Sequence, residues 1–167
     1  MRELHAEFDA CVETRIAAVK LAALQADEDL VAYAAQGDGI RPIETADILR
    51  AQGFRAPFLG LAIGASDERR IGSVRAAQLE TRLDLWLIRP VADAIVEDNW
   101  LGVRILNRCK SIFQDNGGVL EDESGRLTAS LSRFQTVNYP GQLVTQTGNA
   151  LLARLSVIYV SEIDEET

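Results

Sequence analysis

The chain has 167 residues and a formal net charge of −8, from 25 acidic and 17 basic side chains. This length suits a single domain, 1–167, that is large enough to bury its own core. The acidic balance disfavours binding to nucleic acid or to an anionic membrane, because both need clustered lysine and arginine. No run approaches the roughly 18 apolar residues of a membrane span, and the charged stretch 1–9 does not predict a signal peptide.

The first part of the chain reads as two helices. Apolar residues at three- and four-residue steps predict an amphipathic helix over 2–24. Asp27 is a suitable N-cap for a short second helix, and acidic residues follow it where the helix dipole favours them. We expect this helix to end at Gly37, as a left-handed C-cap residue.

A loop over 37–42 and another short helix over 46–52 are predicted next. The apolar run 58–64 is short and bounded by proline and glycine, which indicates a buried strand. The charged residues from Ser66 to Gly72 predict a solvated hairpin loop.

The stretch 75–113 organises the rest of the chain. Apolar and polar residues alternate over 77–88, which predicts a strand with one buried face. From Val91 the apolar residues recur at helical spacing, so a long amphipathic helix should follow directly and run to Phe113.

The last part of the chain predicts further strands. Alternation indicates a strand over 127–132 and another over 151–159. Between them lies a polar loop, 137–149, in which a short strand around Leu143 and Val144 is compatible with the sequence. An acidic tail over about 162–167 is expected to be mobile. The fold class is therefore α+β: a four-stranded, mainly antiparallel sheet with a long helix and an N-terminal helix packed on one face.

Residues that carry chemistry are sparse. The only histidine is His5, and the two cysteines, Cys11 and Cys109, do not form a CxxC motif. We interpret the cysteines as reduced core thiols, with a bridge between them left open. No motif for a nucleophile, a metal or a cofactor is present, so we expect a protein that is not an enzyme and needs no cofactor.

Several segments resemble the tail-completion (tail terminator) proteins of long-tailed bacteriophages. The likeness covers most of the chain in element order and consists of patterns rather than a catalytic signature. It rests on the helix end and glycine turn over 21–42, the strand at 56–64, the strand at 78–89 with Leu83, Leu85 and Trp86 in the matching places, and the closing strand 154–160.

The resemblance implies a structural protein of the virion, assembled in the host cytoplasm and located in the tail or neck. Such a protein forms a homohexameric ring at the head-proximal end of the tail. The ring ends polymerisation of the tail tube protein and joins the tail to the head–tail connector protein. DNA passes through it without specific binding, and it has no catalytic residues, no cofactor and no membrane contact.

Alternatives follow from two departures, an extra short helix within 42–56 and a longer helix from Val91. These leave open a head-closure or neck connector protein of the same particles. Two further classes are a small hydrolase, whose carboxylate pair would meet only in space, and an adaptor that binds a peptide along a sheet edge.

Candidate interface residues come from exposed charge and from one aromatic side chain. Arg104 and Arg108 repel each other on one side of the long helix unless an acidic group faces them, and Trp is enriched at interfaces. The interface candidates are Asp67, Glu68, Arg69, Arg70, Trp100, Arg104 and Arg108. The candidate pore-lining acids are Glu121, Asp122 and Glu123.

Neutralising the pore-lining candidates tests their role. If Glu121, Asp122 and Glu123 line a channel that repels DNA, the triple change to Gln, Asn and Gln should alter DNA ejection or retention in assembled particles. Ejection that is indistinguishable from wild type would contradict this assignment.

Overall fold

The computed structural model describes residues 12–71, 76–91, 100–121 and 127–164. His5, Cys11, Asp122 and Glu123, and the predicted helical residues 2–11 and 92–99, lie outside the described residues. The helical elements are α2 (Val12–Gln25), α3 (Glu28–Ala34), η1 (Thr45–Gly53, 3-10), α5 (Leu101–Phe113) and η2 (Asp115–Gly118, 3-10). The strands are β1 (Gly39–Pro42), β2 (Phe58–Ile71), β3 (Ala76–Pro90), β4 (Val119–Glu121), β5 (Leu127–Asn138), β6 (Leu143–Thr145) and β7 (Gly148–Asp164).

The α+β class is confirmed, but the predicted four-stranded sheet is wrong. The described strands form one seven-stranded sheet in the order β1-β2-β3-β7-β5-β4, with β6 paired to β7. It is mixed, because β1 runs parallel to β2 while the other pairs are antiparallel. The added strands β1 and β4 are short and lie in turn-rich sequence. Parallel pairing with β2 holds β1 extended, and antiparallel pairing with the next strand, β5, holds β4 extended, which overrides local propensity.

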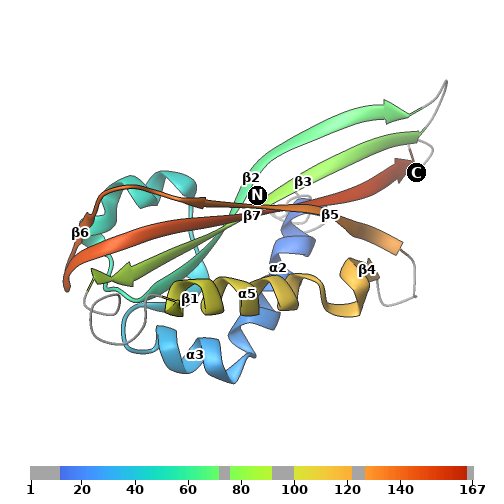
Figure 1. Ribbon diagram of the computed structural model, residues 1–167. Coiled ribbons are helices and arrows are strands. Elements are labelled where there is room, and N and C mark those ends of the chain that lie inside the picture. Colours follow the sequence, from blue (N-terminus) through green and yellow to red (C-terminus); the bar gives the residue numbers. More distant parts are fainter. Residues whose placement is uncertain (1–11, 72–75, 92–99, 122–126, 165–167) are drawn as a thin grey trace, which may run out of the picture.

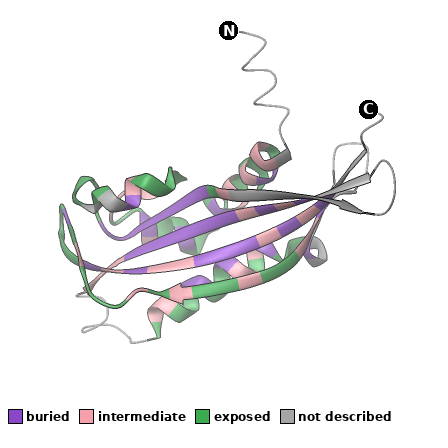
Figure 2. Cartoon of the chain, turned by 90° about the horizontal axis from the view of Figure 1, so that it is seen from above, coloured by how far each residue is buried: buried purple, intermediate pink, exposed green. Residues whose placement is uncertain are grey.

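The sheet has helices on one face, as predicted, and a smaller core on the other. Figure 1 shows α2, α3 and α5 below the sheet and η1 on the opposite side. The core under the helices joins Leu59, Leu83, Leu85, Leu155 and Val157 of the sheet to Ile16, Leu24, Ile105 and Phe113 of the helices. The opposite core contains Ile48, Phe54, Phe58, Trp86, Ile88 and Leu152. Figure 2 shows burial concentrated along the central strands. In β3, Leu85 packs under the helices while Trp86 and Ile88 pack with Ile48 of η1, so this strand is buried on both faces.

The C-terminal end of α5 is held by side chains from two other elements. The last carbonyl groups of a helix have no partner within the helix. The buried Tyr159 hydroxyl donates to the Phe113 carbonyl at 2.9 Å, and Lys20 Nζ donates to the Ile112 carbonyl at 3.2 Å. Burial raises the pKa of Tyr159 and lowers that of Lys20, the latter opposed by nearby Asp115. These bonds fix α5 against β7 and α2.

Strands β2, β3 and β7 continue past the helices as an arm, defined here as 66–71, 76–80 and 160–164. Figure 1 shows the far ends of β2 and β3 rising away from the helices. Two predictions are corrected here. The expected hairpin loop from Ser66 is strand as far as Ile71, where it pairs with Ala76, and the expected mobile tail is strand as far as Asp164. Backbone pairing with β3 carries these charged segments into the sheet.

The predicted C-cap at Gly37 is also wrong. Helix α3 is capped by Ala35 in the right-handed helical region, and Gly37 does not have a positive φ. A Cβ on Gly37 would lie within 3.0 Å of the backbone carbonyl oxygens of Arg55 and Pro57. Gly37 is therefore required for close approach of two backbones, and not for its conformation.

Replacing Gly37 by alanine should destabilise the protein by about 2 kcal/mol or more, because backbone must move to make room for the methyl group. The matched control is Gly53→Ala, where an added Cβ meets nothing within 4 Å and the effect should stay within about 0.5 kcal/mol. Urea denaturation followed by circular dichroism measures both. Equal stability of the two variants would contradict the packing argument.

Candidate functional site

The arm carries four of the predicted interface residues. Asp67, Glu68, Arg69 and Arg70 lie in β2 and pair in register with Glu80, Leu79, Gln78 and Ala77 of β3. Their side-chain positions lie outside what the structure describes. On the side of β2 away from β3, β1 pairs only as far as Leu61, so within the described ranges no strand covers residues 62–71. An uncovered strand edge offers unpaired backbone groups to another chain.

The other three predicted interface residues, Trp100, Arg104 and Arg108, lie on the outer side of α5 or directly before it. Trp100 directly precedes the helix and is 68% exposed, which suits an interface anchor. Arg104, one turn later, is also exposed. Arg108 is exposed as well, and its guanidinium Nε donates to the Asp27 carboxylate at 2.7 Å. The acidic group that we expected to face Arg104 and Arg108 is therefore Asp27 of the same chain.

Asp27 serves two elements at once. Its carboxylate caps α3, as predicted, by accepting a hydrogen bond from the Leu30 backbone N–H at 3.1 Å, and it also accepts from Arg108 of α5. The hydrogen bond from Arg108 is the main cause that lowers the pKa of Asp27, and the same bond raises the pKa of Arg108. This contact links the start of α3 to the middle of α5.

Of the three pore-lining candidates, the structure describes only the backbone of Glu121, which is the last residue of β4.

In the described part of the chain, no group of three or more His, Cys, Asp and Glu side chains is arranged to hold a metal ion. Cys109 is buried and free, and burial raises the pKa of its thiol to about 12. None of the described helices combines the length and apolar character that crossing a membrane would need.

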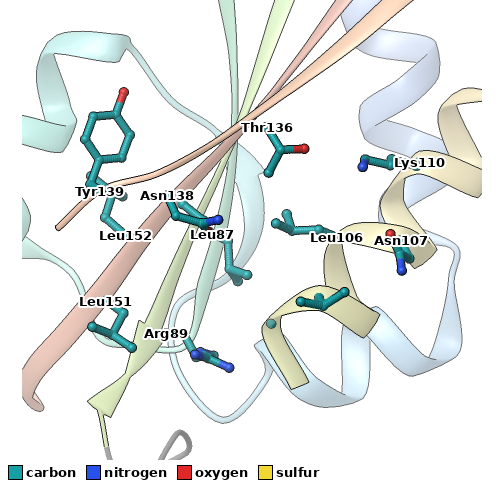
Figure 3. Close-up of a pocket in the computed structure, with 13 residues that line it drawn as sticks. Leu87, Arg89, Leu106, Asn107, Lys110, Thr136, Asn138, Tyr139, Leu151 and Leu152 are labelled. Atoms are coloured by element: carbon teal, nitrogen blue, oxygen red, sulfur yellow. The ribbon is translucent and has the colours of Figure 1, made fainter. Parts of the chain in front are cut away.

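A pocket of about 400 Å³ lies between α5 and the end of the sheet. We call it the α5 pocket. Figure 3 shows Arg89 of β3 at one end and Lys110 of α5 at the other, with Leu87 and Leu106 between them. Polar groups of Asn107, Thr136 and Asn138 also line it. The Tyr139 ring points away, because it stacks on Trp86 on the opposite face, with 5.8 Å between ring centroids.

The α5 pocket is cationic. None of the residues that line it in the described structure is acidic. Among the described residues the buried Nη1 atom of Arg89 finds no hydrogen-bond partner, although such a group in a protein interior normally has one. The guanidinium lies next to Gly102, where an added Cβ would be 3.0 Å from Nη1. The arrangement fits an anionic group bound beside an apolar surface.

A wider, open hollow of about 920 Å³ lies on the opposite face, between η1 and β6. Trp86 and Tyr139 form part of its wall, and the Arg154 guanidinium lies over both rings, 5.6 and 6.0 Å from their centroids. Further along this face, the buried Asp84 accepts a hydrogen bond from Ser156 at 2.7 Å and pairs with Arg82 at 3.3 Å. On this face Arg82 Nε, Trp86 Nε1 and Arg154 Nε are also buried and have no hydrogen-bond partner among the described residues.

A scan against models of protein families and a search of curated proteins both found no match.

Sequence reasoning did not select the α5 pocket. Arg89 reads as the residue before a proline at a strand end, and Lys110 reads as one of several basic residues on a helix. They share a pocket because α5 packs back over the strand that precedes it. One feature of the sequence could have indicated the pocket: Lys110 is one of the few charged residues close to the apolar stripe of the helix.

The Asp27–Arg108 pair predicts a pH-dependent stability. A lowered carboxyl pKa adds stability above the unfolded-state pKa of about 3.9, and this is lost as the pH falls through the folded-state pKa. Asp27→Asn keeps a capping side chain, so it should cost about 0.5–1.5 kcal/mol at pH 7. It should also flatten the decline of stability below about pH 5.

Urea denaturation from pH 3 to pH 7 measures both effects. Glu28→Gln removes an exposed first-turn carboxylate of the same helix and is the matched control. Asp27→Ala should cost about 1 kcal/mol more than Asp27→Asn, because it also removes the cap. A pH dependence of Asp27→Asn that equals that of wild type would refute the contribution of the pair.

Proposed function

We propose that this chain is a structural protein of a long-tailed bacteriophage, which forms a ring at the head-proximal end of the tail. The ring ends polymerisation of the tail tube and joins the tail to the head–tail connector. Its subunits, six by resemblance, contact one another head to tail, and DNA passes through the central hole. The proposal rests on the resemblance of the sequence segments described above and on the form of the sheet.

The single observation that carries the proposal is the arm. Three strands leave the helix-covered part of the sheet together, and the outer edge of β2 is uncovered over 62–71 in the described residues. β5 pairs with β7 only up to Val160, so among described strands the other edge of the arm is also uncovered beyond that residue. Natural proteins seldom leave long strand edges exposed unless another chain uses them. A projection at one end of a subunit suits heterologous contacts, which close into rings.

Charge supports the same role. The chain has a net charge of −8, and a ring of such subunits repels the phosphate backbone of DNA that moves through it. Close subunit contacts between acidic chains then need local basic groups, and Arg104 on the exposed side of α5 is a candidate for one of them.

The solution mass of the purified protein tests the proposal. Light scattering over a range of concentrations should give a ring-sized species, and negative-stain images should show rings with a central hole. Rings added to tails that lack this protein should bind at the head-proximal end, whereas binding to filled heads first would favour a head-closure protein. A protein that remains monomeric and binds no tail end would contradict the proposal.

Charge reversal distinguishes the role of Arg104 from that of Arg108 on α5. Arg104→Glu should disperse the rings with little loss of folding stability, because its side chain is exposed. Arg108→Glu should lower the unfolding free energy, because it places two carboxylates together at Asp27. Light scattering and urea denaturation on the same samples measure both. Rings of Arg104→Glu that survive at physiological salt would show that Arg104 does not hold neighbouring subunits together.

A further inference from the structure

We propose that the α5 pocket binds the acidic C-terminal segment, residues 162–166, of a second copy of this chain. The inference rests on the proposed function, because it names the contact through which one subunit of the ring holds the next. The arm of one subunit would bring its acidic end to the cationic pocket of its neighbour.

The chemistry of the pocket selects an anionic partner. Arg89 enters it from β3 and Lys110 from α5, and no acidic residue among those described lines it. Arginine next to the start of a helix adds positive charge to the positive end of the helix dipole, and Gly102 in the first turn of α5 is the residue that Arg89 lies against. Lys110 lies in the last turn of α5, so the two cations stand at opposite ends of the pocket, and their positive charge is one that carboxylates would neutralise.

The walls of the pocket select an anion attached to apolar groups. Leu87, Leu106 and Leu151 contribute apolar surface, and Asn107, Thr136 and Asn138 contribute hydrogen-bonding groups. The segment Glu162-Ile163-Asp164-Glu165-Glu166 combines four carboxylates with one isoleucine. It is the most acidic run in the chain, so charge complementarity favours it over the other acidic segments.

The topology excludes binding of this segment to its own pocket. Ala76, at the start of β3, pairs with Asp164, and Pro90, at its end, pairs with Ala150. The end of β7 at Asp164 and the α5 pocket therefore lie at opposite ends of the same strands, on the order of 45 Å apart for an extended strand of this length. Figure 1 shows the end of β7 in the arm and the start of α5 at the other end of the sheet. The occupant must come from a second molecule, and the contact is heterologous.

A labelled peptide tests the contact directly. The receptor is the full chain with its own segment neutralised, Glu162→Gln, Asp164→Asn, Glu165→Gln and Glu166→Gln, so that its pocket is not occupied by a neighbour. Fluorescence anisotropy with a fluorescein-labelled, amidated peptide of residues 160–167 should show saturable binding. The same peptide with its acids changed to amides should bind at least roughly ten-fold more weakly.

Variants of the receptor locate the binding site. Arg89→Gln with Lys110→Gln should weaken peptide binding roughly ten-fold or more. The control is Arg15→Gln with Arg50→Gln, which removes the same charge from exposed positions on α2 and η1 and should change binding by less than about two-fold. Circular dichroism confirms that each receptor is folded. If the Arg89 and Lys110 variant unfolds, Gly102→Val, which crowds the Arg89 guanidinium, replaces it.

The outcomes separate this inference from the proposed function. Peptide binding that depends on Arg89 and Lys110 supports the inference even if rings do not form. Rings of the wild-type chain together with a peptide that does not bind, or that binds all receptors equally, overturn the inference and leave the proposed function intact. Glutarate that displaces the peptide at equal concentration would show a small-carboxylate site instead, and would also overturn it.

Discussion

The contact between Asp27 and Arg108 joins the start of α3 to the middle of α5, the helix that packs along the sheet. One carboxylate caps α3 and at the same time accepts a hydrogen bond from α5. At the C-terminal end of α5, Lys20 and Tyr159 donate to its last carbonyl groups. Helix α5 is therefore held at two levels, by α2 and α3 on one side and by the sheet on the other. Its position sets the depth of the core and the width of the α5 pocket.

Because the helices cover only part of the sheet, the molecule has two unlike ends. At one end, β2, β3 and β7 run on as the arm, with strand edges that no described strand covers. At the other end, α5 begins beside Arg89 and the pocket opens between helix and sheet. The acidic run 162–166 begins within the arm and a cationic pocket lies at the opposite end, which is the arrangement that the proposed head-to-tail contact uses. This asymmetry is what a ring of identical subunits requires.

The elements with strong periodicity were predictable and those made by long-range pairing were not. The alternation of β3 and the helical spacing of α5 follow from the sequence, and Asp27 was identified as a cap. Strand β1 was predicted as a loop because its parallel partner is not visible locally, and Gly37 was assigned to a helix end when it in fact meets the backbone of residues 55–57. The α5 pocket was missed because Arg89 and Lys110 meet only through the packing of α5 on the sheet. The resemblance to tail-completion proteins stays a prediction.

An electron cryomicroscopy reconstruction of the purified assembly tests the central claim most directly. The account predicts a closed ring around an open channel, in which the arm of each subunit reaches the neighbour and its acidic end lies between Arg89 and Lys110. A two-fold symmetric dimer, or a ring in which the arms are free and the α5 pockets are empty, would contradict it.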